Sequence, residues 1–115
     1  QLSPAKQQKL LNAPLRAPLL LIVVNTSQPH PKISQQNQLL ASGAAAQNLL
    51  NAAWALGLGA MWRSGELANN PQVAAALGLG NYEKIIGFIY LGQKQGTPKT
   101  PPQINTANYH QEWQG

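Results

Sequence analysis

The sequence predicts a mixed α/β layered structure with two buried strands, one long central helix, two short helices and an extended C-terminal tail. Residues 19–24 and 84–92 are apolar runs without alternation, which is typical of strands covered on both faces. Residues 33–58 are rich in small and apolar residues and predict the long helix. Two strands alone do not make a stable sheet. We therefore expect further strands from a missing segment or from another chain, and the first residue, Gln1 in place of a start methionine, agrees with a missing segment.

A short helix is expected near the start of the chain. Ser3 followed by Pro4 is a helix N-cap with proline at the first helical position, and the helix should run to about Leu11. Pro14 and Pro18 restrict the backbone before them, which predicts an extended connector into the first strand.

The central helix has clear start and stop signals. Ser34 is a good N-cap, and Gly57 and Gly59 should supply the left-handed positions that stop the helix. Because the helix is apolar on most of its circumference, we expect it to lie inside a fold. It is either a core helix with a satisfied amide stripe, or a helix that packs on a partner subunit or beside a cofactor. Uncharged polar side chains in its middle, such as Gln47, argue against a membrane span.

The last third of the chain contains a second helix signal and the second strand. Asn70 and Pro71 open a short helix, and Gly78 ends it. Within the strand, Gly87 marks a place where another group packs tightly.

From residue 93 the composition changes to Gln, Pro, Thr and Asn, so we separate residues 1–92 from a tail over residues 93–115. The tail is either disordered or an arm whose aromatic residues, Tyr109 and Trp113, dock on a neighbouring subunit.

The charged residues exclude several classes of function. They make up only 10% of the chain, with a net charge of +5, and the Lys and Arg residues are scattered, so we expect no nucleic-acid partner. The chain has no Cys and no Asp, and its carboxylates are Glu66, Glu83 and Glu112. A thiol nucleophile, a Ser-His-Asp triad and a magnesium site are therefore excluded, and we expect His30 and His110 to meet solvent. If the protein is an enzyme, a cofactor carries the chemistry.

Three segments together carry a family resemblance. They are the proline-flanked connector and first strand, the helix and turn over residues 43–65, and the strand over residues 85–92. In this order, over about residues 9–95, they resemble the C-terminal part of an FMN-dependent nitroreductase of the small, single-domain YdjA-like branch. Residues 1–92 would then be the C-terminal part of a nitroreductase-like domain.

The resemblance implies an α+β fold, with a mixed sheet covered by helices that is incomplete in this chain. It implies a homodimer with FMN at the subunit interface. It also implies an enzyme that passes electrons from NAD(P)H through FMN to small-molecule acceptors of the nitroaromatic or quinone-like kind. We expect a cytoplasmic protein without a membrane partner.

The resemblance also assigns site residues by matching positions, and none of them is catalytic or metal-binding. The turn that contacts FMN matches Trp62, Arg63, Ser64 and Gly65. The segment assigned to the nicotinamide nucleotide consists of Ala52, Ala53, Trp54, Ala55, Leu56 and Gly57.

A glycine-bounded turn suits a flavin because its backbone amides can approach the ring. Trp62 could pack on an apolar edge of the ring and Arg63 could meet negative charge. The ordinary alternative places Trp62 in the core and Arg63 at helix carbonyls.

The family's arginine-rich, phosphate-binding N-terminal part has no counterpart in these residues. We therefore expect the FMN phosphate to lack its main cationic partners in this chain. The alternative function is a non-catalytic fragment that serves as a dimerisation module through the small-residue helix.

Overall fold

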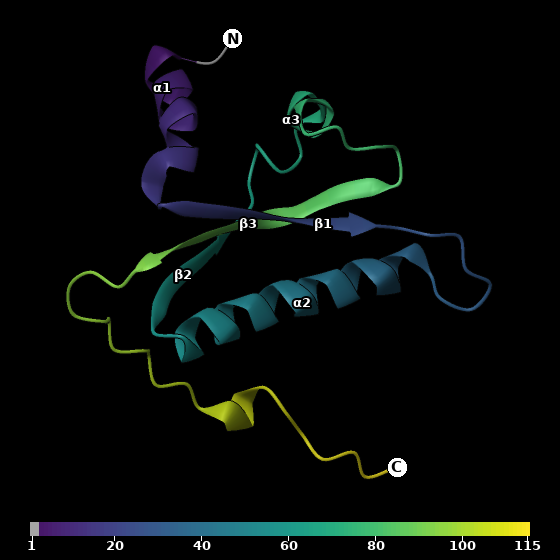
Figure 1. Ribbon diagram of the computed structural model, residues 1–115. Coiled ribbons are helices and arrows are strands. Elements are labelled where there is room, and N and C mark those ends of the chain that lie inside the picture. The colour runs from purple at the N-terminus through teal and green to yellow at the C-terminus, as the bar shows by residue number, and fades with distance from the viewer. Residues whose placement is uncertain (1–2) are drawn as a thin grey trace.

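The computed structural model describes residues 3–115 and confirms the α+β class (Figure 1). Its sheet has three strands in the order β1-β3-β2, so that β3 (Glu83–Gln93) lies between β1 (Leu19–Thr26) and β2 (Leu58–Arg63). Both pairings are antiparallel, whereas the resemblance implies a mixed sheet. Gln1 lies outside the described residues.

Strand β2 is an element that the sequence does not predict, because its glycines suggest a turn. In the structure all of β2 pairs with β3, from Leu58 opposite Gln93 to Arg63 opposite Phe88. The left-handed conformation occurs at Gly57, with φ of +79°, and not at Gly59, which lies within the strand. The third strand of the sheet therefore comes from this chain itself, and not from a missing segment or another chain.

Helix α2 (Gln35–Ala55) lies along one face of the sheet, below it in Figure 1. Its predicted N-cap is confirmed, because the backbone N–H of Asn37 donates to Ser34 Oγ at 3.2 Å. Only one side of the helix is covered: Ala46 and Ala53 are its buried residues, and Leu40 on the other side is 65% exposed. The expected enclosure of this helix inside the fold is therefore wrong for the described chain.

The hydrophobic core lies between α2 and the middle of the sheet. Ile89 of the central strand and Ala46 of α2 are both fully buried there. The half-buried residues around them come from all three strands and from α2: Leu21, Val23, Leu50, Leu58, Trp62 and Ile86. The expectation that both predicted strands are covered on both faces fails for β1, whose apolar residues are mostly half-buried. The reason is that α2 covers one face only.

A buried polar network fixes the start of α2 to the end of β1. Asn25 Nδ2 donates to the carbonyl oxygen of Gln38 at 3.2 Å and to Ser42 Oγ at 2.9 Å. The hydroxyl of Ser27 donates to Asn25 Oδ1 at 2.7 Å. Asn25 is 4% exposed, so these bonds satisfy an amide that is removed from water.

The two short helices lie on the other side of the sheet (Figure 1). Helices α1 (Pro4–Asn12) and α3 (Pro71–Ala76) confirm both predicted short helices and their caps. The connector after α1 is not extended as predicted. It forms a 3₁₀ turn, η1 (Ala13–Arg16), and only Ala17 is extended, with φ of −139°. A proline near the start of such a turn fits because its fixed φ is also the helical value.

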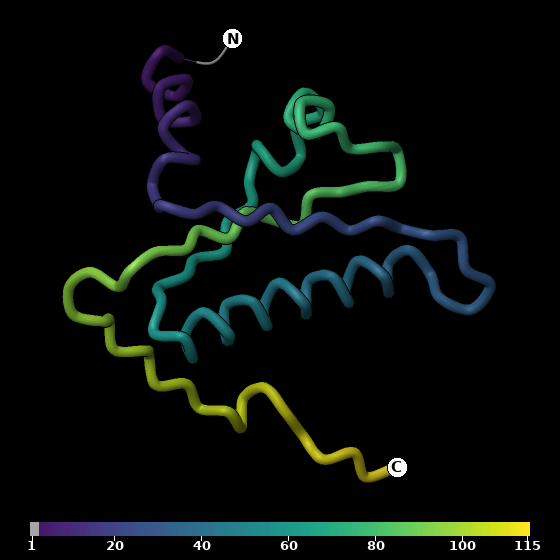
Figure 2. Tube along the Cα trace, viewed as in Figure 1, coloured from purple at the N-terminus to yellow at the C-terminus, as the bar shows by residue number. Residues whose placement is uncertain are grey.

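In the part of the chain that the structure describes, the segment after β3 contains no further strand or α-helix. Residues 94–115 are exposed and run as extended chain with one 3₁₀ turn, η2 (Thr106–Asn108) (Figure 2). Tyr109 and Trp113 are 79% and 87% exposed, so neither docks on residues 3–115. The radius of gyration is 17.8 Å, against about 13 Å for a compact domain of this length. Among the described residues, no helix is both long and apolar enough to cross a membrane.

Candidate cofactor-binding site

Trp62 and Arg63 lie next to each other in β2, and strand alternation sends their side chains to opposite faces of the sheet. Trp62 packs with the core on the α2 side, where its ring comes 3.8 Å from a Cβ built on Gly43. A Cβ on Gly87 would overlap the indole, so the tight packing predicted at Gly87 is confirmed. Trp62 therefore occupies the core position of the ordinary alternative.

A bulge in β3 supplies the hydrogen-bond partner of this indole. Val23 pairs with Gly87 and the next residue, Val24, pairs with Ile85, so that Ile86 has no partner in β1. The Trp62 Nε1–H donates to the carbonyl oxygen of Ile86 at 3.4 Å. This arrangement fixes the end of β2, from which Arg63 and the following turn project.

Arg63, Ser64 and Gly65 line one cavity of about 510 Å³ between α1, η1 and the end of β2. Gly65 has a φ of +78°, which bends the chain there. Strand β3 supplies an aromatic wall. The remaining lining residues that bear on ligand chemistry are Lys6, Lys9, Arg16, Glu66, Phe88 and Tyr90.

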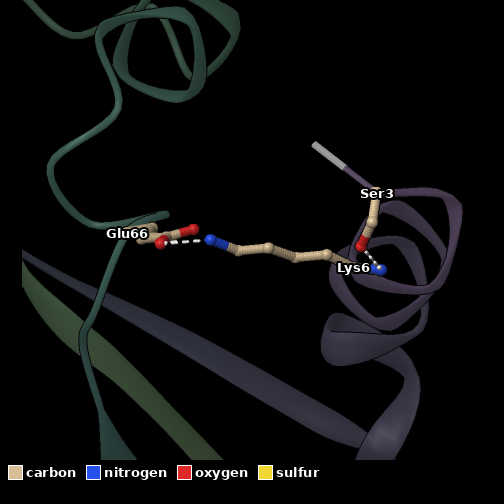
Figure 3. A network of polar contacts seen from close by, with 3 residues as sticks. All are labelled: Ser3, Lys6 and Glu66. Atoms are coloured by element: carbon tan, nitrogen blue, oxygen red, sulfur yellow. Dashed lines mark hydrogen bonds and ion pairs between the residues drawn. The ribbon is translucent and has the colours of Figure 1, made fainter. Parts of the chain in front are cut away.

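The first cavity is strongly positive. Its only carboxylate, Glu66, accepts from Lys6 Nζ at 2.6 Å across the gap between α1 and the loop after β2 (Figure 3). This pair is partly exposed and contributes little to stability. It is the only ion pair within residues 3–115, so Lys9, Arg16 and Arg63 have no carboxylate partner there.

A second cavity of about 1070 Å³ adjoins the first and shares Arg16 and Tyr90 with it. Trp54 at the end of α2 lines this cavity, together with Met61 of β2 and the first residues of the tail. Lys94 Nζ lies 3.5 Å from the centroid of the Trp54 ring, which is a cation–π contact.

The predicted site residues are thus only partly brought together. Arg63, Ser64 and Gly65 share the first cavity, and Trp54 alone of the segment 52–57 lines the second. Trp62 lines neither cavity. In the rest of the segment 52–57, Ala53 is buried in the core, whereas Ala52, Ala55, Leu56 and Gly57 are exposed outside both cavities.

The sequence does not single out Lys9, Arg16 or Tyr90, although all three line the first cavity. The resemblance assigns site roles only to residues 52–57 and 62–65, so Lys9 and Arg16 lie outside the predicted site. Their convergence depends on how α1 and η1 sit beside β2, which no local pattern records. An arginine between two prolines is the one signal that could have drawn attention to Arg16.

The model of the nitroreductase family matches residues 1–93. The chain belongs to the nitroreductase family. It is 41% identical over 87 residues to "Putative NAD(P)H nitroreductase YdjA" of Escherichia coli (strain K12), a match that covers 76% of this chain and 48% of YdjA. The chain therefore spans about half the length of this curated relative.

Solved structures show the same fold. A nitroreductase-like family protein from Bacillus cereus is 26% identical with a TM-score of 0.78, over 96% of this chain and 59% of that one. A protein from Desulfovibrio desulfuricans, described as a putative nitroreductase in complex with FMN, is 20% identical with a TM-score of 0.59, over 97% of this chain and 86% of that one. At that identity the likeness concerns the fold alone.

Proposed function

We propose that the protein containing this chain is an FMN-dependent oxidoreductase that passes electrons from NAD(P)H to nitroaromatic or quinone-like acceptors. Membership of the nitroreductase family supports the proposal, as does the name of YdjA. The observation that carries it is the first cavity. There three of the four residues that match the flavin turn, Arg63, Ser64 and Gly65, lie beside Lys9 and Arg16.

The residues of the first cavity fit a phosphate-bearing aromatic group. Arg16 and Arg63 offer planar guanidinium groups that can each grip a phosphate with two parallel hydrogen bonds. Lys9 adds a third cation without a carboxylate partner among residues 3–115. Phe88 and Tyr90 supply aromatic surface for a ring. If these cations bind the phosphate, the expectation that the FMN phosphate lacks its main cationic partners in this chain is wrong in part.

When bound, FMN would supply the redox chemistry, accepting hydride and returning electrons to a second substrate. The residues of this chain would bind that group and orient it. Arg16 and Arg63 hold negative charge, and the backbone of the Ser64–Gly65 turn can come close to the ring because Gly65 has no side chain. Trp62 does not line the cavity, but its hydrogen bond to the carbonyl oxygen of Ile86 fixes the strand from which Arg63 projects.

We also propose that the protein is a homodimer and that the exposed side of α2 faces the second copy. Leu40 and Trp54 are each 65% exposed on this helix. A long helix with apolar residues on both sides is stable when both sides are covered. The same surface favours the second candidate function, a dimerisation module without activity.

Purification of the natural protein that contains this chain tests the proposed function. We expect bound flavin to be visible in its absorbance spectrum, and NAD(P)H oxidation that depends on an added nitroaromatic acceptor. A protein that is dimeric but neither retains nor rebinds FMN would overturn the oxidoreductase proposal and favour the dimerisation module.

A further inference from the structure

The cations of this chain are concentrated at the two cavities. Of the eight Lys and Arg residues, only Lys32 and Lys84 lie outside both cavity linings. The sequence does not reveal this concentration of cations, because α1, η1, β2 and the tail each contribute some of them. The six residues that line the cavities are Lys6, Lys9, Arg16, Arg63, Lys94 and Lys99.

The second cavity has more positive charge than its own residues neutralise. Arg16, Lys94 and Lys99 line it, and its lining contains no carboxylate. None of the three forms an ion pair within residues 3–115. Uncompensated cations around a concave surface attract an anionic ligand and raise its rate of association.

A contact with the Trp54 ring fixes the position of the Lys94 ammonium group. The ammonium lies 3.5 Å from the centroid of the Trp54 ring, which covers one side of the charge. An ammonium has three N–H donors, so the remaining side can donate to an anion in the cavity. Lys99 lines the same cavity from the extended tail, directly after Pro98.

Lys94 and Lys99 are also outside the part of the chain that the family model matches, which ends at residue 93. The positive wall that they form comes from the tail, whereas Trp54 lies within the matched part. Trp54 belongs to the segment 52–57, which the resemblance assigns to the nicotinamide nucleotide.

We propose that the second cavity selects NADPH over NADH, with Lys94 and Lys99 binding the 2′-phosphate that only NADPH carries. This inference rests on the proposed function, since it concerns the electron donor of the same enzyme. The two donors differ by that one dianionic group, so uncompensated cations at its position favour NADPH. Charge-assisted hydrogen bonds to a phosphate are the physical basis of the preference.

The test compares the two donors in the natural protein and in the double variant Lys94→Gln/Lys99→Gln. We expect kcat/KM to favour NADPH by about tenfold or more, the size of one charge-assisted hydrogen bond. In the double variant the ratio should fall to about one, mainly through a higher KM for NADPH. Lys84→Gln is the matched control, because Lys84 is exposed outside both cavities, and it should keep the natural ratio.

Calorimetric binding of 2′,5′-ADP and 5′-AMP gives a readout that does not depend on turnover. We expect 2′,5′-ADP to bind about tenfold tighter than 5′-AMP to the natural protein, and equally weakly to the double variant. Equal use of NADH and NADPH, or a preference that survives the double substitution, would overturn the inference while the oxidoreductase proposal stands.

The same measurements also distinguish a failure of the oxidoreductase proposal alone. One outcome is a protein that binds 2′,5′-ADP through the two lysines but retains no flavin and oxidises neither donor. That result would support the phosphate site and overturn the proposed function. If 2′,5′-ADP does not bind and neither donor is oxidised, both proposals fail.

Discussion

The indole of Trp62 lies on the backbone of Gly87, in the space that the Cβ of any other residue would occupy. Trp62 comes from the edge strand β2 and Gly87 from the central strand β3, so the contact joins the two strands where the candidate site begins. The bulge at Ile86 completes the arrangement by presenting a carbonyl oxygen to the indole N–H. A glycine is therefore required here by packing.

Gly87→Ala should destabilise the protein by about 1–3 kcal/mol, the usual cost of forcing extra volume into a packed core. The new Cβ would overlap the indole and lie 2.9 Å from the carbonyl oxygen of Arg63. Urea denaturation of the natural protein and the variant measures the change. The matched control is Gly43→Ala, whose Cβ would meet the same indole at an ordinary distance of 3.8 Å.

Because Gly43 lies inside α2, alanine there should stabilise the protein by about 0.5–1 kcal/mol. Opposite signs at the two glycines are thus expected. If the two substitutions changed stability with the same sign and size, the placement of Trp62 between Gly43 and Gly87 would be contradicted.

Asn25→Ala should lower the free energy of unfolding by about 1–3 kcal/mol, because it leaves buried polar groups without partners. Asn25 bonds Gln38, Ser42 and Ser27, and it joins β1 to α2. Asn37→Ala on the exposed surface of α2 is the control and should change stability by less than about 0.5 kcal/mol. Thermal unfolding of both variants gives the comparison, and similar melting temperatures for the two would refute the network's role.

Local signals in the sequence predict the ends of the helices well. Ser3, Ser34 and Asn70 each cap a helix as expected, because a cap depends on residues within one turn. Strand β2 is missed for the opposite reason: its stability comes from pairing with β3, more than 20 residues later in the chain. The extended connector is wrong because Pro14 fits a 3₁₀ turn as readily as an extended chain.

The candidate site is predictable only in part, because some of its residues are close in the sequence and others meet only in the folded structure. Arg63, Ser64 and Gly65 are consecutive, so a sequence pattern can identify them together. Arg16 reaches the same cavity from a distant segment, through the packing of η1 beside the sheet. Trp54 shares a cavity with Lys94 because the tail passes the end of α2, which composition alone does not specify.

Arg16→Gln and Arg63→Gln should each weaken FMN binding by about tenfold or more, since each removes a charge-assisted contact from the phosphate. Quenching of flavin fluorescence on titration of the apoprotein measures the dissociation constant. Lys32→Gln, which alters a cation outside both cavities, serves as the control. The first cavity is not the phosphate site if all three variants bind FMN like the natural protein.

Leu40→Glu should shift the protein from dimer to monomer, raising the dimer dissociation constant by at least about tenfold. The side chain is 65% exposed on α2 and would be covered by the second copy. Tyr82→Glu is the control, because Tyr82 is 61% exposed in the loop before β3. Sedimentation equilibrium measures both constants, and an unchanged dimer in Leu40→Glu would place the interface elsewhere.

Helix α2 rests on the sheet with one side and leaves the other uncovered. If a second copy supplies the missing cover, folding and assembly become a single reaction for this polypeptide, and mass action governs both. Its melting temperature would then rise with the amount of protein in the sample, and dilution by itself would favour the unfolded chain.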